Sequence, residues 1–223
     1  MSFFHRLVVE TLGGQQSLAS VPQIEDGLVG RISRETYIAY LAEAYHHVKH
    51  TVPLMQAAKA RLDGRHARFR TALDEYIAEE TGHEAWVLND IRHCGGDAEA
   101  VRLGEPRAAT RAMVYYVYRY IAERNPMGFF GMVLVLEGTS TRLATQGAAA
   151  VAASLGLGPE CFSYLTSHGS LDLQHLVFFQ TLMDEVEDPE DQAAIVEVAG
   201  AVFELFADVF RAIPHDRSLA HVV

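Results

Sequence analysis

Two short stretches of the sequence combine carboxylates and imidazoles at a spacing that suits metal binding. Glu80 and His83 are three residues apart in "EETGHEAW", and Asp172 and His175 are three apart in "HGSLDLQH". On a helix, residues three or four apart share a face, with β-carbons about 5–6 Å apart. His168 lies four residues before Asp172 and extends the second pair. In helical bundles, two such pairs completed by further carboxylates hold two iron or manganese ions.

Other segments offer the remaining ligands. Glu137 ends the apolar run "FFGMVLVLEG", where an ionised carboxylate is costly unless it has a partner such as a metal ion. The segment "EAYHHVKH" contributes Glu43 as the preferred extra carboxylate and His47 as its alternative. Glu79 and Glu80 are alternative candidates for the same metal-ligand position. We expect Glu79 to face solvent or to contact a metal ligand without binding the metal itself. Taken alone, each of these pairs and carboxylates also fits a solvated acidic helix face or a hydrogen-bonded core histidine. Their occurrence together in one chain favours a metal site.

The elements that position these residues are predicted to be helices. Apolar residues recur at spacings of three and four almost throughout, which indicates an all-α protein of about seven helices in a single domain, residues 1–223. Ser33 is the expected N-cap of the first long helix, which Pro53 kinks or ends. The main predicted segments are 34–51 with its continuation 53–62, 66–94, 106–124, 127–156, 159–169, 170–188 and 190–213. The Tyr- and Val-rich segment 113–120 also fits a strand, but we predict a helix because its neighbours are helical.

Composition excludes several classes of protein. The 223 residues carry a formal charge of −11 without a stripe of Lys and Arg, which argues against nucleic-acid binding. The apolar runs are shorter than the roughly 20 residues of a membrane span. No secretory signal is evident, so we expect a cytoplasmic protein. Cys94 and Cys161 lack the spacing of a thiolate metal site or a disulfide framework. We expect a homodimer, because the last helix looks apolar on more than one face.

Four segments together resemble one known superfamily. They are "TYIAYLAEAYHHVKHTVPL", "EETGHEAWVLNDI", "NPMGFFGMVLVLEGTS" and "SHGSLDLQH". They are similar to the TenA/PqqC-like superfamily, which has the haem-oxygenase fold, and within it to the haem-oxygenase-like di-iron oxidases. The resemblance covers most of the chain, residues 33–185, and the final His-x3-Asp-x2-His motif matches in full. It implies a haem-oxygenase-like helical bundle and a metal-ligand set of Glu80, His83, Glu137, His168, Asp172 and His175.

The same resemblance implies a chemistry. It implies two Fe(II) ions per chain, with manganese as an alternative, that use O₂ to oxidise a small organic substrate. Tyr37, Trp86 and Phe129 are candidates for the lining of the substrate pocket. Two alternatives come from other classes. One is a metal-free TenA/PqqC-like binding or accessory protein with a buried polar network, and the other is a thiaminase-like hydrolase with a cysteine nucleophile.

Overall fold

Helices form nearly all of the backbone, as the apolar periodicity predicts. The computed structural model describes the backbone of residues 1–215 and the side chains of residues 1–167 and 175–215. Within that part of the chain 82% of the structure is helical and there is no strand, so the all-α class is confirmed. The α-helices are α1 (Phe3–Glu10), α2 (Leu12–Ala19), α3 (Pro22–Leu28), α4 (Arg34–Val48), α5 (Thr51–Arg61), α6 (Ala67–Glu80), α7 (His83–His93), α8 (Ala98–Leu103), α9 (Ala108–Glu123), α10 (Phe129–Leu155), α11 (Ser163–Asp184) and α12 (Pro189–Arg211). Short 3₁₀ helices are η1 (Gly64–His66), η2 (Pro126–Gly128) and η3 (Pro159–Cys161).

The expectation of about seven helices was too low. Helices α1 to α3 occupy an N-terminal region where no helix was predicted. The first predicted long helix breaks at Lys49 and His50, before Pro53. Pro53 lies in the first turn of α5, where the missing N–H costs little. The second predicted long helix, residues 66–94, breaks at Gly82, whose backbone is left-handed with a φ of 95°. Ser33 caps α4 as expected, because its hydroxyl accepts from the N–H of Thr36 at 3.1 Å.

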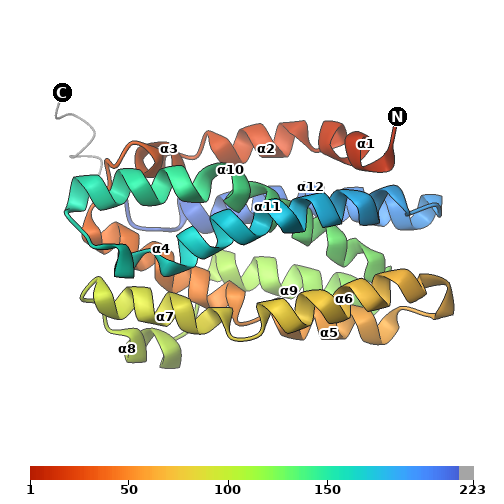
Figure 1. Cartoon of the computed structure of the whole chain (residues 1–223), viewed down its shortest axis with the longest axis horizontal. Helices are drawn as coiled ribbons and strands as arrows, with labels where there is room; N and C mark the ends of the chain where they lie inside the picture. Colours follow the sequence, from red (N-terminus) through yellow and green to blue (C-terminus); the bar gives the residue numbers. More distant parts are fainter. Residues whose placement is uncertain (216–223) are drawn as a thin grey trace.

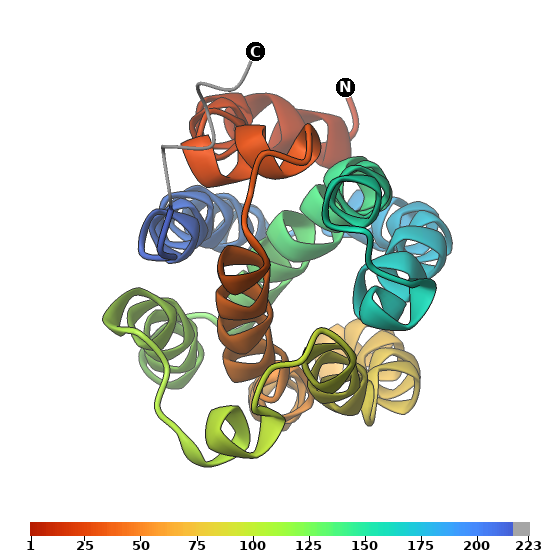
Figure 2. The same cartoon turned by 90° about the vertical axis from the view of Figure 1, so that its left-hand side faces the viewer.

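The long helices run along the long axis of the molecule (Figure 1). Seen from one end, α4 and the first turns of α10 lie inside the ring that the other helices form (Figure 2). Helix α10 packs against α11 and α12, and a β-carbon built at Gly131 would lie 2.6 Å from the backbone nitrogen of Ala199 in α12. Gly131 therefore permits the close approach of these two helices.

Helix α12 is covered within the chain. Its buried side chains, among them Ile195, Val198 and Phe203, belong to the main core cluster. It contacts α9, α10 and α2. Contacts within the chain therefore explain why α12 is apolar on several faces. The homodimer remains a prediction, but the apolar faces of α12 no longer argue for it. Among the described helices, none is both long and apolar enough to cross a membrane.

Asp90 ties two of the site-bearing helices together. It lies in α7, is fully buried, and accepts the backbone N–H groups of Ser163 at 3.0 Å and Tyr164 at 2.8 Å. The Ser163 hydroxyl also donates to it. Burial raises the pKa of Asp90, an effect that these hydrogen bonds oppose. The carboxylate thus satisfies the otherwise unpaired N–H groups at the start of α11 and fixes that helix against α7.

Replacing Asp90 by alanine should destabilise the protein by about 2–4 kcal/mol, because two buried N–H groups lose a charged acceptor. Urea denaturation measures the loss. The matched control is Asp97→Ala, which removes a cap from α8 at an exposed position and should cost about 1 kcal/mol. Equal losses in the two variants would contradict the role given to Asp90.

Candidate metal centre

Glu80 and His83 form a buried pair across a helix break. Glu80 is the last residue of α6 and His83 the first of α7, and Oε2 of Glu80 lies 2.9 Å from Nδ1 of His83. Their exposures are only 8% and 5%. The expectation that both sit on one continuous helix was wrong. The left-handed turn at Gly82 brings them together, and a β-carbon there would meet no described heavy atom within 4 Å. Gly82 is therefore explained by its left-handed backbone conformation.

His175 lies between two carboxylates from different helices. Its Nε2 is 2.8 Å from Oε2 of Glu79 on α6, and its Nδ1 is 3.8 Å from Oε1 of Glu137 on α10. His175 and the Glu137 side chain are largely buried, whereas the Glu79 side chain is 58% exposed. The neighbours Glu79 and Glu80 thus serve different imidazoles: Glu80 contacts His83, and Glu79 contacts His175 from the outer side.

Aromatic rings support both imidazoles. The Trp86 ring stacks on His83 with centroids 4.0 Å apart, and Tyr76 packs edge-on against His175 at 5.5 Å. Trp86 does not line the apolar cavity beside Glu80 and Glu137, which differs from its expected role in the substrate pocket. Sequence reasoning missed Tyr76, although it lies four residues before Glu80, a spacing that places both on one face of α6.

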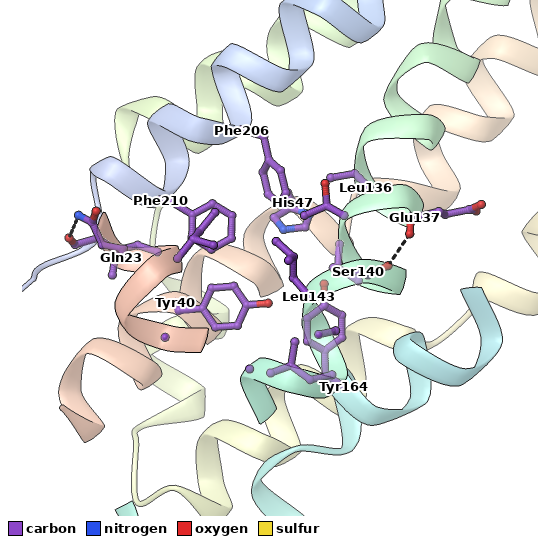
Figure 3. A pocket seen from close by; sticks show the side chains of 18 of the residues that line it. Gln23, Tyr40, His47, Leu136, Glu137, Ser140, Leu143, Tyr164, Phe206 and Phe210 are labelled. Atoms are coloured by element: carbon purple, nitrogen blue, oxygen red, sulfur yellow. Dashed lines mark hydrogen bonds between the residues drawn. The ribbon is translucent and has the colours of Figure 1, made fainter. Parts of the chain in front are cut away.

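A cavity of about 190 Å³ adjoins these residues. Glu80, Glu137 and His47 line it, as do Tyr37 and Phe129, which were expected near the substrate. Most of the other lining side chains are apolar. Figure 3 shows Tyr40, His47, Tyr164 and Phe210 around a common space, with the Glu137 carboxylate directed away from Tyr40. Tyr40, Tyr164 and Ser140 were missed, although Ser140 follows Glu137 by three residues, a spacing that marks a shared helix face.

The two candidate ligands on α4 have different surroundings. Glu43 is 5% exposed and accepts the N–H of Arg107 at 3.2 Å and the hydroxyl of Thr110, so it holds the start of α9. It is not among the residues that line the cavity. His47 does line the cavity and packs edge-on against Phe206, with centroids 5.7 Å apart. The structure therefore places His47, the alternative candidate, on the same cavity as Glu80 and Glu137, whereas Glu43, the preferred candidate, lies away from it.

The other two predicted ligands, His168 and Asp172, belong to α11, and their side chains lie outside the described residues. Among the side chains that are described, no three His, Cys, Asp or Glu residues form a group that would hold a metal ion. The donor atoms that are described still have the chemistry that iron and manganese bind. They are the buried carboxylate of Glu80 and the largely buried carboxylate of Glu137, each near an imidazole.

The cysteines do not fit a nucleophilic role. Cys94 and Cys161 are each 1% exposed, and neither lines the cavity. Burial raises the pKa of Cys94 to about 12, aided by the hydrogen bond that its thiol donates to Cys161, so almost none of this thiol is ionised near neutral pH. Because the thiolate is the reactive form, this arrangement argues against the thiaminase-like alternative.

Solved structures share this architecture. A domain of unknown function with a haem-oxygenase-like fold from Shewanella denitrificans is 24% identical, with a TM-score of 0.84 over 96% of this chain and 92% of that one. Haem oxygenase-1 from Synechocystis, solved with haem, is 13% identical, with a TM-score of 0.76 over 99% and 95%. A TenA homologue from Pseudomonas syringae is 12% identical, with a TM-score of 0.76 over 94% and 91%. At these identities the similarity shows the fold, which is haem-oxygenase-like.

Residues 38–207 match the family model of the iron-containing redox enzymes, and this chain belongs to that family. No curated protein sequence matches the chain. The fold and the family resemblance predicted from the sequence are both confirmed.

The fluorescence of Trp86 should report metal binding. Trp86 is the only tryptophan of the chain and stacks on His83, so an open-shell ion bound to that imidazole should quench it. Titrating metal-free protein with Co(II) or anaerobic Fe(II) should lower the emission to a plateau.

The matched variants separate this response from unspecific quenching. His83→Ala should abolish the saturable decrease, whereas His93→Ala, at the exposed end of the same helix, should leave it intact. A saturable decrease that survives in His83→Ala would show that the ion binds elsewhere.

Proposed function

We propose that this enzyme is a non-haem di-iron oxidase or oxygenase that uses O₂ to oxidise a small organic substrate. The observation that supports it most is the placement of two Glu–His pairs, Glu80 with His83 and Glu137 with His175, beside one apolar cavity. Membership of the iron-containing redox enzymes supports the same reading. The residues that would hold the two ions are Glu80, His83, Glu137, His168, Asp172 and His175.

The protein environment prepares these ligands. Bound iron supplies the electrons for O₂ reduction, a reaction that side chains cannot perform alone. Glu79 accepts a hydrogen bond from Nε2 of His175, which fixes the orientation of the imidazole ring. The same hydrogen bond makes the other ring nitrogen, Nδ1, more basic and therefore a stronger ligand for a metal ion. The stacked Trp86 restricts rotation of His83. The carboxylates Glu80 and Glu137 are shielded from water, which strengthens their attraction for a cation.

The cavity provides the place for the substrate. Its apolar wall excludes water from the space beside Glu80 and Glu137. Burial raises the pKa of Tyr40, so this phenol keeps its proton at physiological pH and can donate a hydrogen bond to a bound molecule. His47 offers a second polar group on the same wall.

A second candidate is a metal-free binding or accessory protein. The observation in its favour is that the charges already satisfy one another, since Glu80 contacts His83 at 2.9 Å and Glu79 contacts His175 at 2.8 Å. Buried polar groups paired in this way can be purely structural. The two candidates differ in whether the protein binds stoichiometric iron.

Two neighbouring substitutions test the proposal. Glu80→Gln should lower bound iron below the expected value of about two per chain and abolish O₂ consumption, because it removes a ligand. Glu79→Gln should keep the iron stoichiometry but weaken affinity by roughly 10–100-fold, because it removes only the hydrogen bond to His175. Elemental analysis after anaerobic Fe(II) loading and an oxygen electrode measure both effects.

Helical content and an unrelated carboxylate serve as controls. Circular dichroism should be unchanged in both variants, and Glu84→Ala, in the first turn of α7, should retain full iron and activity. The proposal is wrong if Glu80→Gln binds as much iron as the unmodified protein. Wild-type protein without stoichiometric iron would favour the accessory role.

A further inference from the structure

The described wall of the cavity is helical except at two residues. Of the lining residues, only Ile32 and Ile213 lie outside a helix. Ile32 belongs to the linker between α3 and α4, and Ile213 belongs to residues 212–215, which follow α12 and are called here the C-terminal segment. These are the places where the described wall can open without taking a helix out of the core.

Hydrogen bonds from α3 and α4 hold the C-terminal segment against the cavity. The side-chain amide of Gln23 donates to the carbonyl oxygens of Arg211 and Ile213, each at 3.2 Å (Figure 3). The hydroxyl of Thr36 donates to the carbonyl oxygen of Pro214 at 3.0 Å. Ile213 is the one buried side chain of the segment, and it completes the wall.

Asp26 connects the C-terminal segment with the linker. It lies on α3, and only 7% of it is exposed. Its Oδ2 is 2.8 Å from Nε2 of His215, and its Oδ1 accepts a hydrogen bond from Nε of Arg31 at 2.9 Å. One buried carboxylate therefore ties together the two non-helical parts of the wall, with hydrogen bonds to groups that carry or can carry a positive charge.

The two non-helical parts are not held equally. The linker packs closely on α10, because a β-carbon at Gly30 would lie only 2.6 Å from the carbonyl oxygen of Ala150 and 2.9 Å from Cβ of Ser154. The C-terminal segment is held by the side-chain hydrogen bonds of Gln23, Thr36 and Asp26 and by the burial of one side chain. Segments with few buried apolar groups open at the lowest cost, so the C-terminal segment opens before the linker does.

We propose that the C-terminal segment is a lid over this end of the cavity and that Asp26 is its latch. The lid turns about Ala212, where α12 ends, and carries Ile213 out of the wall. A lid of this kind admits a small molecule and then excludes water from the space around it. The proposal concerns entry to the cavity and needs no bound metal, so it stands or fails separately from the proposed function.

A thiol placed inside the cavity measures how often the lid opens. Val133→Cys introduces one at a wall position that is 5% exposed. Its rate of reaction with methyl methanethiosulfonate, a small uncharged reagent, is followed by peptide mass spectrometry. Adding Asp26→Ala should raise this rate roughly tenfold or more, because two hydrogen bonds to a buried charge are lost. His215→Ala and Gln23→Ala, at partly exposed positions, should each raise it about fivefold.

The natural thiols and a second buried aspartate separate lid opening from general loss of stability. Cys94 and Cys161 are each 1% exposed and do not line the cavity, so their labelling rates should not change in the lid variants. Asp191→Ala removes a similar pair at the start of α12, where Asp191 contacts His66 at 3.0 Å. It should change the labelling of all three thiols by one common factor.

Three results would overturn the lid. The first is an unchanged labelling rate of the introduced thiol in Asp26→Ala, His215→Ala and Gln23→Ala. The second is an equal increase for the introduced thiol and the two natural thiols in these variants, because the whole protein would then be opening. The third is labelling in the Val133→Cys protein as fast as in Ala149→Cys, whose position on α10 is exposed, because the cavity would then stand open without a lid.

Discussion

The interior of this protein is arranged around two carboxylates that it would be costly to bury alone. Glu80 and Glu137 are placed beside an apolar cavity, where an isolated charge is strongly unfavourable. Each is given an imidazole from another segment, at 2.9 Å for His83 and 3.8 Å for His175. The residues that meet this requirement come from the end of α6, the start of α7, the third turn of α10 and the second half of α11. The relative positions of these four helices follow from that need, and the same pairs have the donor chemistry of a metal site.

Several local features hold the four segments in place. The left-handed Gly82 folds the chain so that α7 restarts next to the end of α6. Asp90 then connects α7 to the first turn of α11. Helix α10 has two roles along its length: its first turns pack tightly on α12 through Gly131, and its later turns line the cavity, largely with small residues. A single long helix thereby joins the core that provides stability to the cavity that would receive the substrate.

Much of this was predictable because it is encoded locally. The periodicity predicted the helical class, and Ser33 marked a real helix start. The contact between Glu80 and His83 was predicted for the wrong reason. Two residues three apart in the sequence can meet across a tight turn as well as on one face of a helix. Glu43 and His47 were not separable from sequence, since their difference depends on where α9 packs against α4. Likewise, no local signal distinguishes Gly131, which packs closely, from Gly147, which leaves space.

The most direct test of the central claim is an anomalous-scattering crystal structure at the iron edge, from crystals loaded anaerobically with Fe(II). The account predicts two iron peaks beside the cavity, within reach of the side chains of Glu80, His83, Glu137 and His175. The absence of iron, with the Glu80 to His83 contact unchanged, would contradict it and would leave these residues as a structural network. Iron bound away from the cavity that Glu80 and Glu137 line would contradict it equally.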